Sequence, residues 1–146
     1  MWWRKHMTNV IAVLLALIIC TASYLAFFDT NNPRVLDGQL RGEDGAYKNQ
    51  FKPGENLYVY RKFCVDRVVT GDVDIEIINK ETGEYFYLGN RATGARKGCS
   101  ERTSITRLPL ALRPGIYRYR ATIQYNVNPL RTVVYEVPEL EFVVVK

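Results

Sequence analysis

Histidine is almost missing from this 146-residue chain. The single one is His6, which lies ahead of the first apolar run. The rest of the sequence therefore lacks the imidazole of Ser–His and Cys–His nucleophile pairs and of histidine-based metal sites. The sequence also has no glycine-rich phosphate loop, no metal-ligand cluster and no G-x-S-x-G nucleophile motif. We therefore expect neither an enzyme nor a protein that holds a metal or another cofactor.

The chain has no tract rich in lysine and arginine either. Only Arg4 and Lys5 of the 20 basic residues precede Phe28, whereas all 15 acidic residues follow it. The part beyond Phe28 thus carries 18 basic and 15 acidic residues, a net charge of +3. Nucleic-acid binding needs a concentrated basic stripe, so no nucleic-acid partner is expected. A weak attraction to anionic lipid or wall polymer stays open.

One uncharged apolar run, 10–28, fills the N-terminal region. Its 19 residues reach about 28 Å as a helix, close to the hydrocarbon thickness of a bilayer. A signal peptide has an apolar core of only about 7–15 residues before a small-residue cleavage site. Cys20-Thr21-Ala22 resembles such a site weakly, and the run continues past it. We predict a retained transmembrane helix over 10–28; a cleaved signal and a lipoprotein are the alternatives.

The charges around the span predict its orientation. Arg4 and Lys5 precede it and Asp29 follows it, so the positive-inside rule keeps residues 1–9 cytoplasmic and exports the C-terminal part. Within the span, Ala12, Ala16 and Cys20 recur every four residues on one helix face. This small-residue pattern favours pairing of two membrane helices and hence a homo-oligomer. The alternative is that alanine is simply common in such spans.

The remainder predicts a short stalk over 29–36 and one all-β domain over 37–146. Leu57 to Asp66 alternates between apolar and polar residues, with Arg61 as the exception on the apolar face. Asn79 to Gly83 predicts a hairpin turn, and Pro138 predicts an edge or a bulge. Seven or eight strands are expected: 39–41, 57–66, 72–77, 85–88, 103–108, 116–125, 132–137 and 140–145.

The sequence before the strongest strand, Leu110 to Tyr117, predicts the class of sandwich. A leucine, a Pro-Gly turn and a tyrosine entering a long strand resemble the tyrosine corner of immunoglobulin-like domains, in which the hydroxyl bonds to upstream backbone. Tyr117 is the candidate, and Tyr119 is the second choice. We therefore predict an immunoglobulin-like β-sandwich preceded by one transmembrane helix.

Two cysteines, Cys64 and Cys99, lie in the exported part. Two cysteines in an oxidising compartment predict one disulfide, and the alternative is two free thiols. The bond would join a strand to the loop 89–101, whose sequence GNRATGARKGCSE shows no periodicity. That loop carries Arg91, Arg96 and Lys97 and is a candidate site for an acidic partner or a phosphate. The alternative is an ordinary solvated loop.

Tyrosine and arginine are enriched on the predicted strands, and both are common in binding hot spots. They are equally ordinary as exposed strand residues. The row Asp72, Asp74 and Glu76 has the residue type for acid–base work or calcium, but its alternation favours a solvated face. The candidate binding residues on the strands are Tyr58, Tyr60, Arg118 and Arg120, with Tyr85 and Tyr87 beside them.

The run LRPGIYRYRATIQYNVNPLRTVVYEVPELEFVV, the leader and the two-cysteine spacing resemble small single-pass membrane proteins encoded by tailed bacteriophages. The resemblance implies a bacterial inner membrane as the location and a periplasmic sandwich, and it supplies no catalytic residues. We expect a membrane-anchored binding module with an unknown protein partner, such as a regulator of lysis or superinfection. The alternative is a structural subunit of a virion or of a membrane assembly.

Overall fold

A computed structural model describes residues 2–27, 33–128 and 130–146 of the chain. Residues Trp2–Phe27 form helix α1. Its segment Asn9–Phe27, with a mean hydropathy of 2.6, is long and apolar enough to cross a bilayer, and the most apolar part of it has no buried residue. This segment agrees with the predicted span 10–28 to within one residue, and Phe28 lies outside the described residues.

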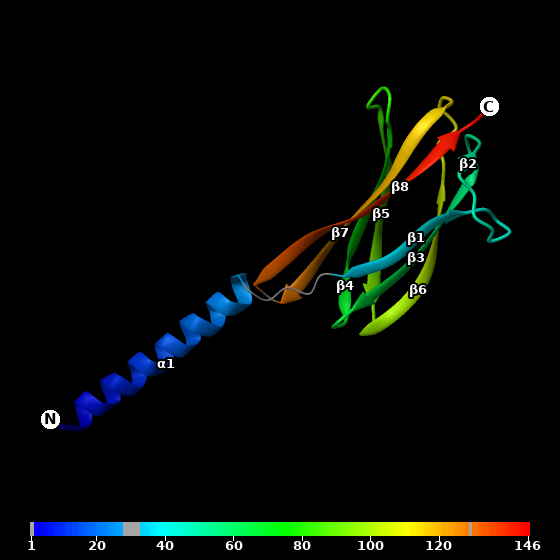
Figure 1. Cartoon of the computed structure of the whole chain (residues 1–146). Helices are drawn as coiled ribbons and strands as arrows, with labels where there is room; N and C mark the ends of the chain where they lie inside the picture. Colours follow the sequence, from blue (N-terminus) through cyan, green and yellow to red (C-terminus); the bar gives the residue numbers. More distant parts are fainter. Residues whose placement is uncertain (1, 28–32, 129) are drawn as a thin grey trace.

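The described residues after α1 form eight strands in two sheets (Figure 1). One sheet has the strand order β1-β3-β6 and the other has the order β2-β8-β7-β4-β5. Neighbouring strands are antiparallel, except that β2 runs parallel to β8. The strands are β1 (Arg34–Arg41), β2 (Gln50–Phe51), β3 (Asn56–Val65), β4 (Val69–Asn79), β5 (Tyr85–Ala95), β6 (Gly98–Arg107), β7 (Gly115–Asn128) and β8 (Arg131–Val144).

This strand order is that of an immunoglobulin-like sandwich, which confirms the predicted fold class. Strands β1, β3 and β6 take the places of strands A, B and E, and β4, β7 and β8 take those of C, F and G. At the start of β7, the Tyr117 hydroxyl donates to the carbonyl oxygen of Arg113 at 3.0 Å. This is the tyrosine-corner contact that the Pro-Gly turn predicts.

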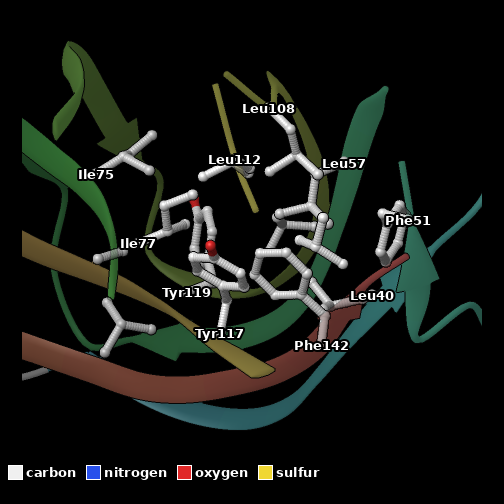
Figure 2. Packing of buried hydrophobic residues seen from close by; sticks show 14 residues of the cluster. Leu40, Phe51, Leu57, Ile75, Ile77, Leu108, Leu112, Tyr117, Tyr119 and Phe142 are labelled. Carbon is white, nitrogen blue, oxygen red and sulfur yellow. The ribbon is translucent and has the colours of Figure 1, made fainter. Parts of the chain in front are cut away.

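Alternating side chains fill the space between the sheets. Leu57 and Val59 point inward from β3, and Tyr117 and Tyr119 point inward from β7; all four are buried. Near the C-terminal end of β8, the Phe142 ring stacks on Tyr117 and meets Phe51 edge-on, with 5.8 Å between ring centroids in both pairs (Figure 2). Aromatic packing therefore closes this end of the sandwich.

The opposite end of the sandwich adjoins α1 (Figure 1). The Asn128 side-chain amide, in the β7–β8 hairpin, donates to the Leu25 carbonyl oxygen at 2.8 Å. The start of β1, the β3–β4 and β5–β6 connections and the β7–β8 hairpin all lie at this end. We call it the helix-proximal end and define it by residues 34, 66–68, 96–97, 128 and 130–131.

The segment 89–101 is not the loop that its composition predicted. Strand β5 continues to Ala95 and β6 begins at Gly98, so only Arg96 and Lys97 connect them. The glycines have local roles: Gly89 adopts a φ of 123° beside a bulge, because Leu88 has no partner between Ile75 and Glu76. A glycine at a bulge interrupts the alternation of apolar and polar residues, so the sequence of this strand resembles that of a loop.

Strands β1 and β8 also differ from the prediction. Strand β1 begins at Arg34, so residues 34–36 of the predicted stalk 29–36 belong to the sheet, and residues 29–32 lie outside the described residues. A register shift between Val35 and Asp37 conceals the alternation there. Strand β8 runs through Pro138 without a break, and the register shift between Tyr119 and Ala121 shows that Pro138 lies in a bulge, as predicted.

Cys64 and Cys99 form a disulfide, as predicted. They are direct partners in the β3–β6 register, so the bond joins two neighbouring strands of one sheet rather than a strand and a loop. Their separation in the sequence is 35 residues. The antibody-type bond instead links the two sheets, whereas this bond lies within the β1-β3-β6 sheet.

Replacing Tyr117 by Phe removes the corner hydrogen bond while keeping the ring. We expect the free energy of unfolding to fall by about 1 kcal/mol, because a buried hydrogen bond contributes roughly that much. Tyr47→Phe is the matched control: its ring is 69% exposed, and we expect a change below about 0.5 kcal/mol. Urea unfolding followed by circular dichroism measures both. Equal effects of the two substitutions would contradict the assignment.

Replacing both bonded cysteines, Cys64→Ser with Cys99→Ser, tests the contribution of the disulfide. The chain-entropy model gives a loss of at most about 4 kcal/mol for a closed loop of this length. Chemical unfolding of the oxidised, the reduced and the doubly substituted protein measures it. Reduction of the unsubstituted protein should reproduce the effect of the substitutions, and an unchanged unfolding midpoint would contradict the prediction.

Candidate binding site between the sheets

Three arginines surround the space between the sheets near the helix-proximal end. Arg61 lies on β3, Arg91 on β5 and Arg102 on β6. The sequence predicted Arg91 as a binding residue in a loop and showed Arg61 as a break in the alternation. It did not predict Arg102 as a site residue. The signal for Arg102 is the cross-strand register, which places it directly opposite Arg61.

Arg91 and Arg102 link the edge strands of the two sheets. The Arg91 Nη1 donates to the Ile105 carbonyl oxygen at 2.6 Å, from β5 to β6. In the reverse direction, Arg102 donates from Nη2 to the Gly94 carbonyl oxygen at 2.7 Å and from Nη1 to the Thr93 hydroxyl at 3.3 Å. Strands β5 and β6 belong to different sheets, so these hydrogen bonds close the gap between the two edges.

Arg61 lies deeper, among apolar side chains. Its Nη2 donates to the carbonyl oxygen of Pro138 at 3.0 Å, the residue at the bulge of β8. Its Nη1 is enclosed and has no hydrogen-bond partner in the part of the chain that the structure describes. Burial lowers the pKa of the Arg61 guanidinium, although an arginine remains charged at any ordinary pH. An enclosed N–H group of a cation without a partner is costly in an apolar interior.

Gly38 makes room for this guanidinium. The glycine is the β1 partner of Arg61, and a Cβ at this position would lie 3.1 Å from Arg61 Nη1. Any larger residue would therefore press on the side chain. The small residue of β1 and the bulge of β8 together accommodate one partly buried arginine.

The charges at this site are unbalanced. Residues directly opposite in an antiparallel pair have Cβ atoms about 4.5–5.5 Å apart, and like charges in such a pair repel. Arg61 and Arg102 form such a pair. In the described part of the chain, neither they nor Arg91 form an ion pair with a carboxylate. Within the described residues, their acceptors are carbonyl and hydroxyl oxygens.

These arginines line a cavity of about 250 Å³ between the two sheets. No aspartate or glutamate is among its lining residues, and most of its walls are aliphatic. Burial raises the pKa of the Tyr119 hydroxyl, which also faces this space, while the nearby Arg61 partly offsets the rise. The aliphatic walls come from both sheets: Val59, Val65, Val69, Val73, Ile75, Ala121, Ile123 and Val137.

The other predicted binding residues do not join this site. Tyr58 and Tyr60 alternate with the inward residues of β3, and the Arg41 guanidinium lies 3.8 Å from the centroid of the Tyr60 ring. Arg118 and Arg120 lie on the outer face of the other sheet, between the inward tyrosines of β7. The two pairs therefore occupy opposite outer faces. Arg96 and Lys97 are exposed at the helix-proximal end.

A charged network covers the outer face of the larger sheet. Arg118 and Arg120 both contact the carboxylate of Glu139, at 3.0 and 2.9 Å, and Arg120 also reaches Glu76 at 3.2 Å. On the same face, Asp74 accepts hydrogen bonds from Tyr87 and Asn90. The row of carboxylates is thus part of a polar outer surface. Among the described residues, no group of three or more His, Cys, Asp or Glu could hold a metal ion.

The predicted helix-pairing residues lie along α1. Ala12, Ala16 and Cys20 are exposed, and Cys20 is a free cysteine. Leu130 of the β7–β8 hairpin lies near α1, where it shares a shallow apolar groove with Leu17, Thr21 and Leu25.

No family model matches the sequence, and no curated protein matches it. Among solved structures, the C-terminal domain of Wzt has a TM-score of 0.58 at 15% identity, over 82% of this chain and 77% of that one. Spo0M, a sporulation control protein from Bacillus subtilis, has a TM-score of 0.47 at 11% identity, over 77% of this chain and 49% of that one. The similarity to the Wzt domain supports the sandwich fold and carries no information on a ligand.

The network around Glu139 predicts a pH dependence of stability. The hydrogen bond from Arg120 holds the pKa of Glu139 below its ordinary value of 4.5. A lowered pKa means that the ion pair stabilises the fold at neutral pH, and that this contribution is lost as the pH falls below 4.5 through the pKa of the folded state. Because the side chains are about one-third exposed, we expect less than about 1 kcal/mol.

Unfolding curves of Glu139→Gln from pH 7 downwards measure this effect. The variant should be less stable than the parent at pH 7, and the two should converge in acid. Glu136→Gln, three residues earlier on β8, is the control, because Glu136 is exposed and makes no ion pair among the described residues. A difference between parent and Glu139→Gln that stays constant with pH would contradict the assignment.

Proposed function

We propose that this chain is a non-catalytic binding module held at a membrane by α1, with its sandwich on the extracytoplasmic side. The cavity between the sheets carries the proposal, because its apolar walls and unbalanced arginines suit a ligand. Among the described residues, no carboxylate, histidine or free cysteine lines the cavity, so these residues offer no ordinary acid–base pair. Binding explains such a lining better than catalysis does.

Two observations support the anchored arrangement. The apolar surface of Asn9–Phe27 is not part of a protein core, and such a surface is stable in lipid. The disulfide between β3 and β6 favours an oxidising compartment such as the periplasm. With Arg4 and Lys5 on the cytoplasmic side, the sandwich would lie outside the inner membrane.

The helix-proximal end has the charge expected of a surface near anionic lipid. Its described residues include five basic side chains and one acidic side chain, Asp66. Asp66 forms an ion pair with Arg34 at 3.2 Å. Each basic residue near an anionic membrane surface contributes about 1 kcal/mol of attraction. The five are Arg34, Arg67, Arg96, Lys97 and Arg131.

If the chain is encoded by a phage, as its resemblance implies, we propose that it regulates lysis or superinfection through a protein partner in the periplasm or membrane. A second candidate is a structural subunit of a virion or a membrane assembly. The exposed small-residue face of α1, with Ala12, Ala16 and Cys20, favours it because such faces allow close helix pairing. Mass spectrometry of purified virions distinguishes the two, since a regulator should be missing from them.

Topology is the direct test of the proposed arrangement. Alkaline phosphatase fused after Lys146 should be active and green fluorescent protein fused there should be dark, because only an exported domain gives this combination. The same reporters placed before Met1 are the control and should give the opposite result. The protein should also stay in the membrane after extraction with alkaline carbonate. Soluble protein that begins near Ser23 would contradict the anchor.

A further inference from the structure

We propose that the cavity between the sheets binds a single-chain amphiphile with an anionic head group, of which a medium-chain fatty acid is the simplest. The head would lie at Arg61 and Arg102, and the chain would lie along the aliphatic walls. The inference rests on the proposed function and names its ligand class. Four properties of the cavity lead to it: charge, walls, volume and position.

The charge of the cavity requires an anion. Arg61 and Arg102 are cross-strand partners that both line the cavity, and neither forms an ion pair with a carboxylate among the described residues. Arg61 Nη1 is enclosed and lacks an acceptor. A carboxylate offers two oxygens to guanidinium groups and neutralises one charge, so it would supply the acceptor that Arg61 Nη1 lacks and reduce the excess positive charge of the lining.

The walls of the cavity require an apolar body. Val73 and Ile75 from β4 face Val59 from β3 across the space, and Ala121 and Val137 line it from β7 and β8. Apolar walls do not hold water well, so a small inorganic anion would leave most of this surface without a partner. A neutral hydrophobic ligand would cover the walls and leave the arginines unbalanced. An amphiphile would both cover the apolar walls and bring an anion to the arginines.

The volume limits the size of the apolar body. The cavity measures about 250 Å³, whereas an engineered apolar cavity of about 150 Å³ accommodates the six carbons of benzene. By that scale the space holds about eight to ten carbon atoms. This number of carbon atoms corresponds to one medium-length chain or to the end of a longer one. The cavity is too small for the two chains of a phospholipid.

The position of the cavity explains where such a ligand would come from. Pro33, Val65, Val69 and Ala95 lie at or next to the helix-proximal end and line the cavity. That end adjoins α1, as the hydrogen bond from Asn128 to Leu25 shows. A bilayer that holds α1 would therefore lie close to the cavity. Fatty acids and single-chain lipids partition into bilayers, which would concentrate the ligand at this end.

Binding of radiolabelled decanoate to the full chain in phosphatidylcholine nanodiscs tests the proposal, with empty nanodiscs as the blank. Decanol tests the chain without the charge, and unlabelled inorganic phosphate tests the charge without the chain. We expect saturable binding of one decanoate per chain. Decanol should bind at least tenfold more weakly, and phosphate at millimolar concentration should not displace decanoate.

Variants assign the two parts of the ligand to their residues. Arg61→Met and Arg102→Met should each weaken decanoate binding at least tenfold and change decanol binding less than threefold, which a purely structural role of the arginines would not produce. Arg107→Met is the matched control on β6, because Arg107 bonds the Gly54 carbonyl oxygen and does not line the cavity. Ala121→Leu should block both decanoate and decanol by filling the space.

Thermal unfolding and the intact Cys64–Cys99 disulfide establish that each variant is folded. Equal affinity for decanoate and decanol, displacement by phosphate, or no binding to the folded parent would each overturn the amphiphile. Equal loss of binding in Arg107→Met and Arg61→Met would do so as well. The topology reporters distinguish this failure from failure of the proposed function, because an active phosphatase fusion with no decanoate binding would reject the ligand alone.

Discussion

The packing of two sheets against each other is the constraint on which the structure depends, and it is satisfied unequally along the sandwich. Far from α1, the rings of Phe51, Tyr117 and Phe142 fill the space between the sheets (Figure 2). Toward α1, aliphatic side chains and arginines surround a cavity instead. The well-packed part stabilises the fold, so the part near α1 can keep an unfilled space and a partly buried cation at a tolerable cost.

The distribution of charge differs in the same way between the outer surface and the cavity. On the outer face of the larger sheet, Arg118 and Arg120 are matched by Glu139 and Glu76. Inside the sandwich, Arg61 and Arg102 have no carboxylate partner among the described residues. A surface arginine gains little from its partner because water already solvates it. The enclosed Nη1 of Arg61 lacks that solvation, so this group is more informative than the surface pairs.

The sequence predicted the elements whose patterns are local. The apolar run of α1, the Asn79–Gly83 turn and the Pro-Gly turn before Tyr117 each depend on neighbouring residues, and each is found where it was expected. The second half of β5 was missed because glycines at a bulge interrupt its alternation. The candidate site was missed for a different reason. Arg61 was visible as an apolar-face exception, but its pairing with Arg102 depends on the β3–β6 register, which no local pattern encodes.

The register also explains why the disulfide and the arginine pair belong together. Strands β3 and β6 bring Cys64 opposite Cys99 and, three residues along β3, Arg61 opposite Arg102. Two arginines at directly opposite positions oppose the pairing of their strands, whereas a covalent bond on the same pair of strands holds it in register. The disulfide thus stabilises the strand pair at the point where the charges weaken it.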